Sequence, residues 1–473
     1  MRAGVRKAFL SSGLALTLMT SGVFAQGLQL PSSPLTIEQA IQFGIENYPS
    51  VRTSLARVQA AKSGVDLTRT AYLPRMDMGY QGSVATFNNV SGLFFPAPFI
   101  PPISGPDLKR NSYSGAWGSA TGAIAAWEPF DFGLRNANVE SARAAERQMA
   151  AGVNLTRLDV GMGVADAFIQ VLVITQTVDA LRGNVERRRI FAETVAVLVK
   201  SGLRPGVDDS RAKAELAAAR TLLIQAEQAK EIARATLAEV LGVAGEQIDV
   251  QVEPLLSLPT SHQLPDSSPT NHPLAVVQKA TAEMFQKRKE ALDRAWVPRF
   301  NLQAGLFSRG SGWDNQGDRQ NGLGPLFPDI PNWAGGLTVS FALMDFASIR
   351  AQRSIELHNE EAESSAYDQV LQALTSKHVK AVETVKGARR VAENTPIQLS
   401  AAKDTETQAR TRYRTGLATV VEVAEAQQLV VQATIDDAVA RLGVWRALLG
   451  LANAQGDIGL FLNLVKAAED LQR

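Results

Sequence analysis

The chain contains the same unit twice, and this repeat constrains its fold more than any other feature. Pro49 and Pro74 are 25 residues apart, and Pro273 and Pro298 repeat that spacing without a gap. An Asn stands two residues before the first proline of each pair. Matching motifs at a fixed spacing are typical of tandem copies of one structural unit.

A second pair of motifs extends the match through the rest of each copy. Asp131 precedes Gly202 by 71 residues, and Asp345 precedes Gly416 by the same 71. We therefore divide the chain into a first repeat over 34–250, a linker rich in Pro and Ser over 251–268, a second repeat over 269–455, and a C-terminal tail over 456–473.

Residues 1–25 have the layout of a cleaved secretory signal peptide. Arg2, Arg6 and Lys7 precede an apolar run that ends in Val-Phe-Ala at residue 25. A basic start, a short apolar core and a small residue before the cleavage point are typical of such signals. The alternative is an N-terminal membrane anchor, but a spanning helix needs about 20 apolar residues. No later stretch is comparably apolar, so we expect no transmembrane helix after residue 25.

The composition excludes several classes of function. The chain has no Cys, which excludes disulfides, thiolate metal sites and Cys nucleophiles. Its 48 basic and 47 acidic residues nearly balance, so the sequence predicts no nucleic-acid partner. His378 falls among the apolar positions of a predicted helix, where a packed histidine is commoner than a ligand. The sequence therefore predicts no catalytic, cofactor-binding or metal-binding residues.

Each repeat is predicted to run in the order short helix, strand, loop, strand, very long helix, turn and long helix. Thr36 and Gln39 have the spacing of a capping box, which predicts a helix start. Pro74 and Pro298 are predicted to end the helical pattern before the first strand of each repeat. Segments 87–111 and 308–331 are rich in Pro, Gly and Asn, and they are predicted to be surface loops.

Four segments alternate apolar residues with small or polar ones at a period of two. They are Arg75–Val84, Ser114–Trp127, Arg299–Phe307 and Asn332–Leu343. A half-buried strand of a soluble protein shows the same alternation. Lengths near the 9 to 11 residues of a membrane-crossing strand, with aromatic residues close to the ends, instead favour a membrane sheet. Those aromatic residues are Tyr80, Tyr113, Trp117, Trp127, Trp296 and Trp333.

Residues 134–201 show a helical pattern with a heptad seam, and the second repeat shows the same stepping from Leu371 to Ala392. A helix of that length extends roughly 100 Å at about 1.5 Å per residue, which an ordinary globular domain does not need. Pro396 interrupts the second pattern. A proline inside a helix costs about 3 kcal/mol, so we expect a kink or a break there.

Four strands are too few to close a barrel by themselves. An open sheet edge in lipid would leave backbone N–H and C=O groups without partners. Membrane strands in this number therefore imply that several copies of the chain assemble.

Taken together, these motifs resemble the TolC-type outer-membrane efflux protein family. The motifs are the twofold repeat, the Asn-x-Pro-x-Val opening at residue 47, Leu73-Pro74 before a strand, Asp-Phe-Gly at residue 131, and the glycine turns at Gly202 and Gly416. The resemblance covers about residues 34–455. It implies a mainly α fold with membrane β strands: a homotrimer with a twelve-stranded barrel in the outer membrane and a twelve-helix tunnel across the periplasm.

The resemblance also implies a function and partners. It implies a passive outer-membrane channel of a Gram-negative bacterium, serving a tripartite efflux pump or a type I secretion system. The expected partners are outer-membrane lipid, a periplasmic adaptor protein and an inner-membrane transporter. A periplasmic adaptor or scaffold with a long helical hairpin stays as the alternative, although it does not account for four amphipathic strands or two full copies.

The family's periplasmic tip has the pattern Arg-Tyr-x-x-Gly, followed by an acidic residue six positions after the glycine. The matching residues are Arg412, Tyr413, Gly416, Leu417, Glu422 and Glu425 in the second repeat, and Gly202, Leu203, Arg204 and Asp208 in the first. The resemblance implies that Glu422, Glu425 and Asp208 ring a closed, cation-preferring aperture, whereas the residues alone favour a solvated helix face.

The other matching residues are assigned to the tip turns, to adaptor contact and to the closing of the tip. Tyr413 and Arg412 are candidates for inter-helix contacts that hold the tip shut, with a packed aromatic and a surface charge as the alternative. A basic residue that can follow the Gly-Leu pair in this family is replaced here by Ala418, which puts a closing contact from that position in doubt.

Overall fold

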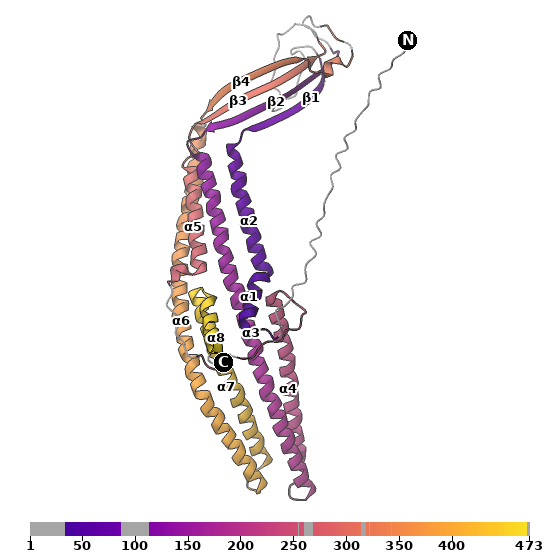
Figure 1. The fold of residues 1–473 in the computed structure, drawn as a ribbon, viewed down its shortest axis with the longest axis vertical. Coiled ribbons are helices and arrows are strands. Elements are labelled where there is room, and N and C mark those ends of the chain that lie inside the picture. Colours follow the sequence, from indigo (N-terminus) through magenta and orange to yellow (C-terminus); the bar gives the residue numbers. More distant parts are fainter. Residues whose placement is uncertain are drawn as a thin grey trace, which may run out of the picture.

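The computed structural model describes residues 34–86, 113–253, 255–259, 268–313, 318–320, 322–341 and 343–470. The predicted signal peptide and the predicted loop 87–111 lie outside these residues. The described strands form one four-stranded sheet. Figure 1 shows a long molecule with this sheet at one end and helical hairpins at the other.

The element order of the sequence prediction is confirmed in both repeats. The first repeat has α1 Ile37–Asn47, α2 Pro49–Arg69, β1 Arg75–Ala85, β2 Ala116–Phe130, α3 Leu134–Lys200 and α4 Gly206–Leu241. The second has α5 Pro273–Leu292, β3 Arg299–Ser311, β4 Ile330–Ser340, α6 Phe346–Arg414 and α7 Val420–Gln455. Four 3-10 turns (Thr70–Tyr72, Pro269–Asn271, Gly324–Leu326 and Leu343–Asp345) and a final helix, α8 Ile458–Asp470, complete the described elements.

Several boundaries differ from the expectation. The second strand covers Ala116–Phe130 and not Ser114–Trp127, and the third continues to Ser311, into the predicted loop 308–331. The helical part before β1 is not one short helix, because Pro49 opens a second helix, α2, directly after α1. The fourth strand begins at Ile330 and ends at Ser340, earlier at both ends than the predicted Asn332–Leu343. The predicted capping box is present, since the Thr36 hydroxyl accepts from Gln39 N and the Gln39 side chain accepts from Thr36 N, both at 3.2 Å.

Proline and glycine explain why the two repeats fold alike midway along the molecule. Pro49 and Pro273 each occupy the first position of a helix, where the missing N–H costs nothing. Each of these helix starts packs against a glycine that ends a hairpin helix. These glycines, Gly242 (φ +80) and Gly456 (φ +79), adopt the left-handed conformation that favours glycine.

His272 begins α5 and joins it to α7. Its Nδ1 accepts from Leu274 N at 3.1 Å, so Nε2 carries the proton and donates to Asn453 O at 3.0 Å. The side chain is 3 % exposed. Burial, the main cause, together with the charge of Lys377, lowers the pKa of His272, against the opposing effects of the Asn453 carbonyl and Asp159. The ring therefore stays neutral and keeps its cap at physiological pH.

The four strands form one antiparallel sheet in the order β1-β2-β3-β4. Pairing of β2 with β3 joins the two repeats. One face of the sheet, here called the apolar face, carries large exposed side chains: Met76, Met78, Tyr80, Val84, Trp117, Trp127, Leu302, Leu306, Trp333, Leu337 and Val339. The opposite face, the polar face, carries Arg75, Asp77, Gln81, Asn301, Gln303, Asn332, Thr338 and Ser340.

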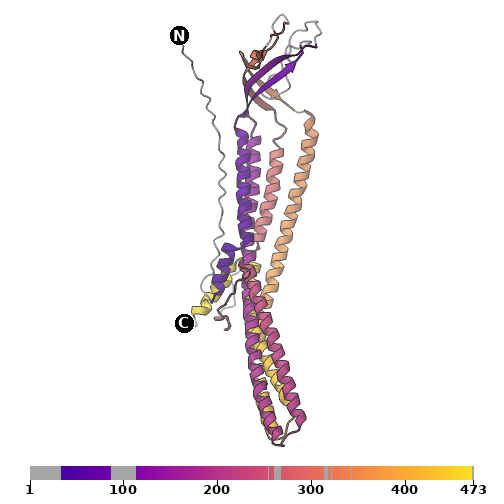
Figure 2. The same ribbon diagram turned by 90° about the vertical axis from the view of Figure 1, so that its right-hand side faces the viewer.

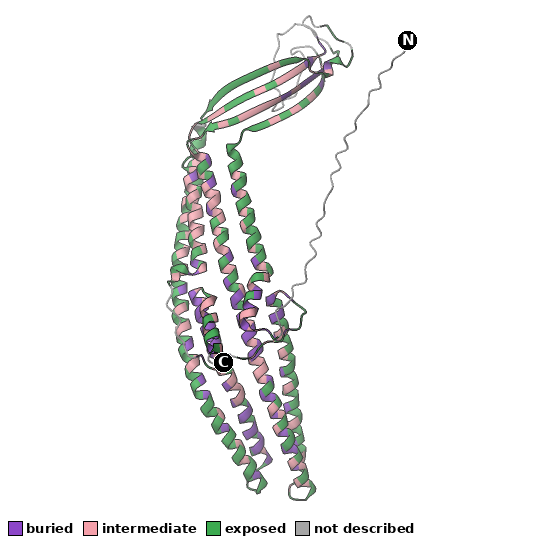
Figure 3. Cartoon of the chain, viewed as in Figure 1, coloured by how far each residue is buried: buried purple, intermediate pink, exposed green. Residues whose placement is uncertain are grey.

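Both outer strands of the sheet lack a neighbour within the described residues. β1 pairs only with β2, and β4 pairs only with β3. The helices follow the same order, with α2 packed on α3, α3 on α5, and α5 on α6, so that α2 and α6 are the outer helices. Figure 3 shows extensive exposure along α6 in the single chain, and only six of its residues are buried.

The predicted long helix is confirmed as α3, Leu134–Lys200, and five residues of its heptad seam are buried. These are Leu158, Met162, Ala165, Ile169 and Leu172. Contrary to the expectation that no later stretch resembles a membrane helix, α3 is long and apolar enough to do so. More than half of that stretch is buried against the rest of the chain, which agrees with a core helix.

Of the two outcomes expected at Pro396, a kink or a break, the break does not occur, because α6 continues from Phe346 to Arg414 with the proline inside it. The neighbouring Thr395, 5 % exposed, donates its hydroxyl to Asp437 Oδ1 of α7 at 3.1 Å. Figure 1 shows α6 bowed along its length. Packing on α7 thus holds the helix together across the missing hydrogen bond.

The largest core lies midway between the sheet and the hairpin tips. Trp445 of α7 is fully buried, contacts Phe461 of α8 edge to face, and donates Nε1–H to Ser257 O at 2.9 Å. Leu255 is 1 % exposed. The predicted linker and the predicted C-terminal tail therefore both contribute to this core, and we keep the division into two repeats as a proposal.

Candidate functional site

The candidate site lies at the tips of the two hairpins, α3–α4 and α6–α7. Figures 1 and 2 both show these tips side by side at the end far from the sheet. In each repeat the long helix ends on a left-handed glycine, Gly202 at φ +74 and Gly416 at φ +82. The next residue donates its N–H five residues back, Leu203 to Leu198 O at 2.9 Å and Leu417 to Arg412 O at 2.8 Å. Both turns are therefore Schellman motifs, which explains the Gly-Leu pairs.

Arg204 joins the first tip to the second. Its guanidinium donates to the carbonyl oxygens of Tyr413 and Ala418, and it lies 4.2 Å from the centre of the Tyr413 ring. Those two carbonyls belong to the end of α6 and to the turn after it. One charged side chain therefore holds the last turn of the other hairpin through charge-assisted hydrogen bonds and a cation–π contact.

Tyr413 makes the reciprocal contact from the second hairpin. Its side chain is 1 % exposed and packs edge to face on Phe191 of α3 with ring centres 5.2 Å apart. Its hydroxyl donates to Asp208 Oδ2 at 3.2 Å. Burial, then the charge of Asp208 and the hydrogen bond to it, raise the pKa of Tyr413 to about 12, so the hydroxyl keeps its proton at neutral pH. Phe191, Arg204, Asp208 and Tyr413 are called the tip cluster below.

Arg412 and Glu422 contact each other within the second hairpin. Arg412 donates to Leu417 O at 3.2 Å, and its guanidinium lies 4.0 Å from Glu422 Oε2. Glu422 belongs to a capping box with Thr419, because it accepts from Thr419 N at 3.1 Å and donates its own N–H to the Thr419 hydroxyl at 3.3 Å. The hydrogen bonds that the Glu422 carboxylate accepts from the backbone N–H and the hydroxyl of Thr419, with a further contribution from Arg412, lower the pKa of Glu422. Glu422 thus stabilises the start of α7.

The remaining predicted residues lie around the tip cluster. Glu425 is exposed one turn after Glu422 on α7, and Asp208 is half-buried in the first turn of α4. Leu203 and Leu417 are 70 % and 69 % exposed. The structure therefore brings Arg204, Asp208 and Tyr413 together and leaves the two leucines open to solvent.

Sequence reasoning missed two residues that link the hairpins. Phe191 stacks on Tyr413, and Arg188, 6 % exposed, binds Glu215 of α4 and Gln428 of α7. Both lie about three to four turns before the Gly202 turn in an unbroken helical pattern, so no motif marks them. Ala418 has no basic side chain for a closing contact, but its backbone carbonyl accepts a hydrogen bond from Arg204. Arg204 follows Gly-Leu in the first repeat as Ala418 does in the second.

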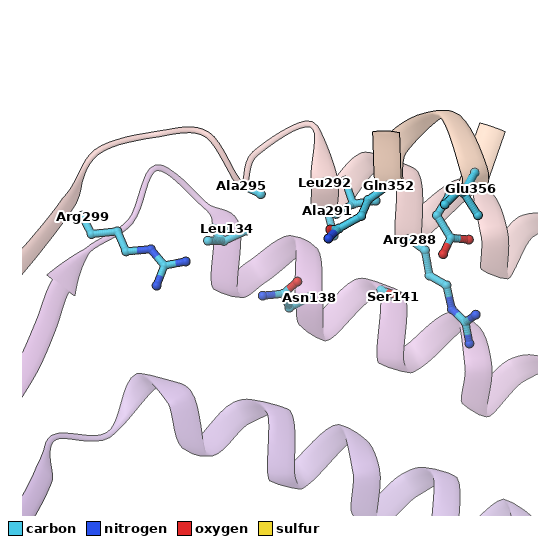
Figure 4. Close-up of a pocket in the computed structure, with 11 residues that line it drawn as sticks. Leu134, Asn138, Ser141, Arg288, Ala291, Leu292, Ala295, Arg299, Gln352 and Glu356 are labelled. Atoms are coloured by element: carbon cyan, nitrogen blue, oxygen red, sulfur yellow. The ribbon is translucent and has the colours of Figure 1, made fainter. Parts of the chain in front are cut away.

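A second concave region lies where the helices meet the sheet. Its volume is about 480 Å³, and it is lined by residues of α3, α5, α6 and β3. Figure 4 shows Arg288, Arg299 and Glu356 around it. Among the residues that the structure describes, no group of three or more His, Cys, Asp or Glu side chains could hold a metal ion.

Comparison with solved structures shows the fold. The outer-membrane channel OprN is 18 % identical, with a TM-score of 0.72 over 89 % of each chain. The CmeC outer membrane channel of Campylobacter jejuni is 14 % identical, with a TM-score of 0.73 over 96 % of this chain and 94 % of that one. The open MtrE outer membrane channel of Neisseria gonorrhoeae is 16 % identical, with a TM-score of 0.70 over 89 % of each chain. The chain therefore has the TolC-like fold.

Comparison of sequences identifies the family. Protein CyaE of Bordetella pertussis is 27 % identical over 238 residues, which are 49 % of this chain and 46 % of that protein, so the match spans about half of the relative. The family model described as outer membrane efflux protein matches residues 40–243 and 265–457. Because these two segments cover most of the chain and correspond to its two repeats, the chain belongs to the outer membrane efflux protein family.

Proposed function

We propose that the chain is one subunit of an outer-membrane channel that passively conducts substrates from an inner-membrane transporter to the exterior. The observation that carries this proposal is the sheet, which has one apolar face and two unpaired edges within the described residues. A periplasmic adaptor, the alternative class, would need no such sheet. Family membership places the chain in the outer membrane of a Gram-negative bacterium, extending into the periplasm.

The unpaired edges support a homotrimer. In lipid, every strand edge needs a partner. The edge strand β4 of one copy would therefore pair with the edge strand β1 of the next. Three copies then give a closed barrel of twelve strands. The outer helices α2 and α6 meet in the same order, so the tunnel continues the barrel into the periplasm.

The hairpin tips are the proposed contact for the periplasmic adaptor. Gly202, Leu203, Gly416 and Leu417 form two similar turns, each presenting an exposed leucine at the end of the molecule. Two equivalent apolar knobs per subunit suit a partner that itself repeats around the trimer. Efflux and type I secretion both agree with this arrangement, since the transporter selects the cargo.

The tip cluster is proposed to hold the channel closed, and the tip carboxylates are proposed to line its aperture. Asp208 contributes to both, because it faces Tyr413 and lies at the tip. Glu422 and Glu425 lie on one side of the first turns of α7, and Glu425 is the more available to solvent ions because Glu422 also caps the helix.

The proposed function has a direct test. The mature chain, purified in detergent, should run on a gel as a heat-modifiable trimer. Added to a planar lipid bilayer, it should give small, cation-selective conductance steps. The tips are proposed to narrow the tunnel, so the steps are expected to be small. A monomer that dissolves without detergent and gives no conductance would contradict the proposal.

The aperture assignment predicts a loss of cation preference when the two α7 carboxylates are neutralised. Glu422→Gln combined with Glu425→Gln removes two charges per subunit, and Gln at residue 422 keeps the capping box. The reversal potential in a salt gradient should move toward zero. The matched control is Glu239→Gln combined with Glu246→Gln. These two exposed carboxylates lie at the far end of α4 and just after it, so the control should leave the potential unchanged. Equal selectivity in both double variants would remove the aperture role.

A further inference from the structure

Residues 322–329, between β3 and β4, fold back across the sheet and do not project away from it. The Gly324–Leu326 turn lies over a row of three small residues that are paired across the strands: Gly82 of β1, Ser119 of β2 and Gly310 of β3. The Ser119 hydroxyl, fully buried, donates to Pro325 O at 2.6 Å, and the Tyr80 hydroxyl donates to Leu326 O at 2.7 Å. This segment is called the outer turn below.

The row of small residues is needed for this close approach. A Cβ at Gly310 would lie 2.5 Å from Pro325 O, closer than van der Waals contact allows, and 2.8 Å from the Ser119 hydroxyl oxygen. A Cβ at Gly82 would touch the Leu326 side chain at 3.7 Å. The sheet therefore has a site shaped for the turn.

The turn lies on the apolar face of the sheet. Tyr80, Gly82 and Ser119 share that face with Met78 and Trp117, because alternate residues of a strand point the same way. In a membrane barrel the apolar face is the outer one and the polar face lines the lumen. The outer turn is thus outside the barrel.

Its depth places it within the hydrocarbon layer. Trp117 and Trp127 of β2 are ten residues apart on the apolar face. At about 3.3 Å per residue and a tilt of about 40°, they are about 25 Å apart along the membrane normal, the height of the apolar band between two aromatic girdles. Ser119 lies two residues from Trp117 in the direction of Trp127, so it is closer to the middle of the membrane than the outer girdle.

The backbone of the outer turn suits a site without water. Leu326 N donates to Leu323 O at 3.0 Å, Phe327 N to Gly324 O at 2.9 Å, and Asp329 N to Arg309 O at 3.1 Å. Pro325 and Pro328 have no N–H to satisfy, and the carbonyls of residues 325 and 326 accept from Ser119 and Tyr80. From residue 325 to residue 329 each N–H is therefore paired or absent, as a non-helical segment requires in lipid, where water cannot replace missing partners.

The side chains of the turn point to the same environment. Residues 322–328 contain no charged side chain, and two of the three large ones, Leu323 and Phe327, are 63 % and 74 % exposed. Asp329, the charged residue of the segment, stands at its end beside β4. We propose that the outer turn is a lipid-facing clasp that presents Leu323 and Phe327 to the acyl chains of the outer leaflet and thickens the apolar band on one side of each subunit.

The absence of cysteine allows a clean test by single labels. Leu323→Cys and Phe327→Cys are labelled with bimane, and the trimer is reconstituted into vesicles of phosphatidylcholine with brominated acyl chains. Leu337→Cys on the apolar face is the lipid-exposed reference, and Thr338→Cys on the polar face is the lumen reference. We expect brominated lipid to quench positions 323 and 327 within about twofold of position 337, and iodide to quench them at least about fivefold less than position 338.

A second variant tests the row of small residues. Gly310→Leu should displace the turn and make the label at residue 327 accessible to iodide. Gly335→Leu is the matched control, because Gly335 lies on the same face with its nearest neighbour, Gln303 O, at 3.8 Å from the added Cβ. Quenching of positions 323 and 327 by iodide alone would overturn the proposal, and protection from both quenchers would do so by placing the turn against a neighbouring copy. Failure of the reference at residue 337 would instead count against the barrel itself.

Discussion

Replacing Arg204 with Ala and Tyr413 with Phe in one chain will raise the mean conductance of the reconstituted trimer severalfold. Both substitutions act on the tip cluster, which joins the two hairpins of a subunit. Arg204→Ala removes the donors to Tyr413 O and Ala418 O, and Tyr413→Phe removes the hydrogen bond to Asp208. The ring of residue 413 still packs on Phe191 in the variant, so the fold of the tip is kept.

The size of the effect follows from the energy of these contacts. A hydrogen bond to a charged group contributes about 1.5 to 3 kcal/mol. Removing one such contact from the closed state alone shifts the ratio of open to closed subunits by roughly ten- to a hundredfold, since about 1.4 kcal/mol is a factor of ten. The open fraction of a channel that is mostly closed then rises severalfold or more.

Arg412→Ala is the matched control for this experiment. Arg412 is also an arginine at the tip, but its contacts with Leu417 O and Glu422 stay within the second hairpin. Single-channel recording should therefore show wild-type conductance for Arg412→Ala and increased conductance for Arg204→Ala. If both single variants, or neither, change the conductance, the tip cluster is not what holds the channel closed.

Gly456→Ala will destabilise the protein far more than the same substitution at the equivalent Gly242. Both glycines have nearly the same left-handed conformation, at φ +79 and φ +80, so an alanine costs about 1 to 2 kcal/mol of strain at either position. At Gly456 the added Cβ would also lie 2.6 Å from Pro273 Cδ and 2.8 Å from His272 Cδ2. At Gly242 the nearest atom, Pro49 Cδ, is 3.5 Å away, an ordinary contact.

The neighbours of Gly456 have little freedom to move. His272 is 3 % exposed and is held by hydrogen bonds at both ring nitrogens, and Pro273 opens α5. Overpacking of this kind costs about 1 to 3 kcal/mol beyond the strain. Denaturant or thermal midpoints of the two purified variants should differ accordingly, with Gly456→Ala the lower. Equal midpoints would show that His272 and Pro273 can move to accommodate the added methyl group at little cost.

Local patterns were sufficient to predict the elements of each repeat. The capping box at Thr36, the prolines before β1 and β3, and the heptad seam of α3 all depend on residues within a few turns of one another, so the sequence alone specifies them. The alternation in the strands likewise identified the apolar face of the sheet. Alternation could not show where the outer turn lies, because that depends on three strands in register and on a segment that contains no regular strand.

The tip illustrates the same limit in the candidate site. The repeat spacing located Gly202, Gly416 and the residues around them, but it did not show which side chains meet. Tyr413 contacts Phe191 and Asp208, more than 200 residues earlier, only because two long hairpins end at the same level. The spacing also did not show that Arg204 contacts the other hairpin, whereas Arg412 contacts only its own.

The sequence by itself determined the order of helices and strands, because periodicity, caps and turn residues act over short distances. It also predicted the twofold repeat and the assembly of several copies. Only the tertiary structure decided that Pro396 stays within a continuous α6, that Glu422 caps α7, and that the segment after Gln455 forms a core helix. Each of these outcomes depends on packing between segments far apart in the chain, and such packing can outweigh a local preference of a few kcal/mol.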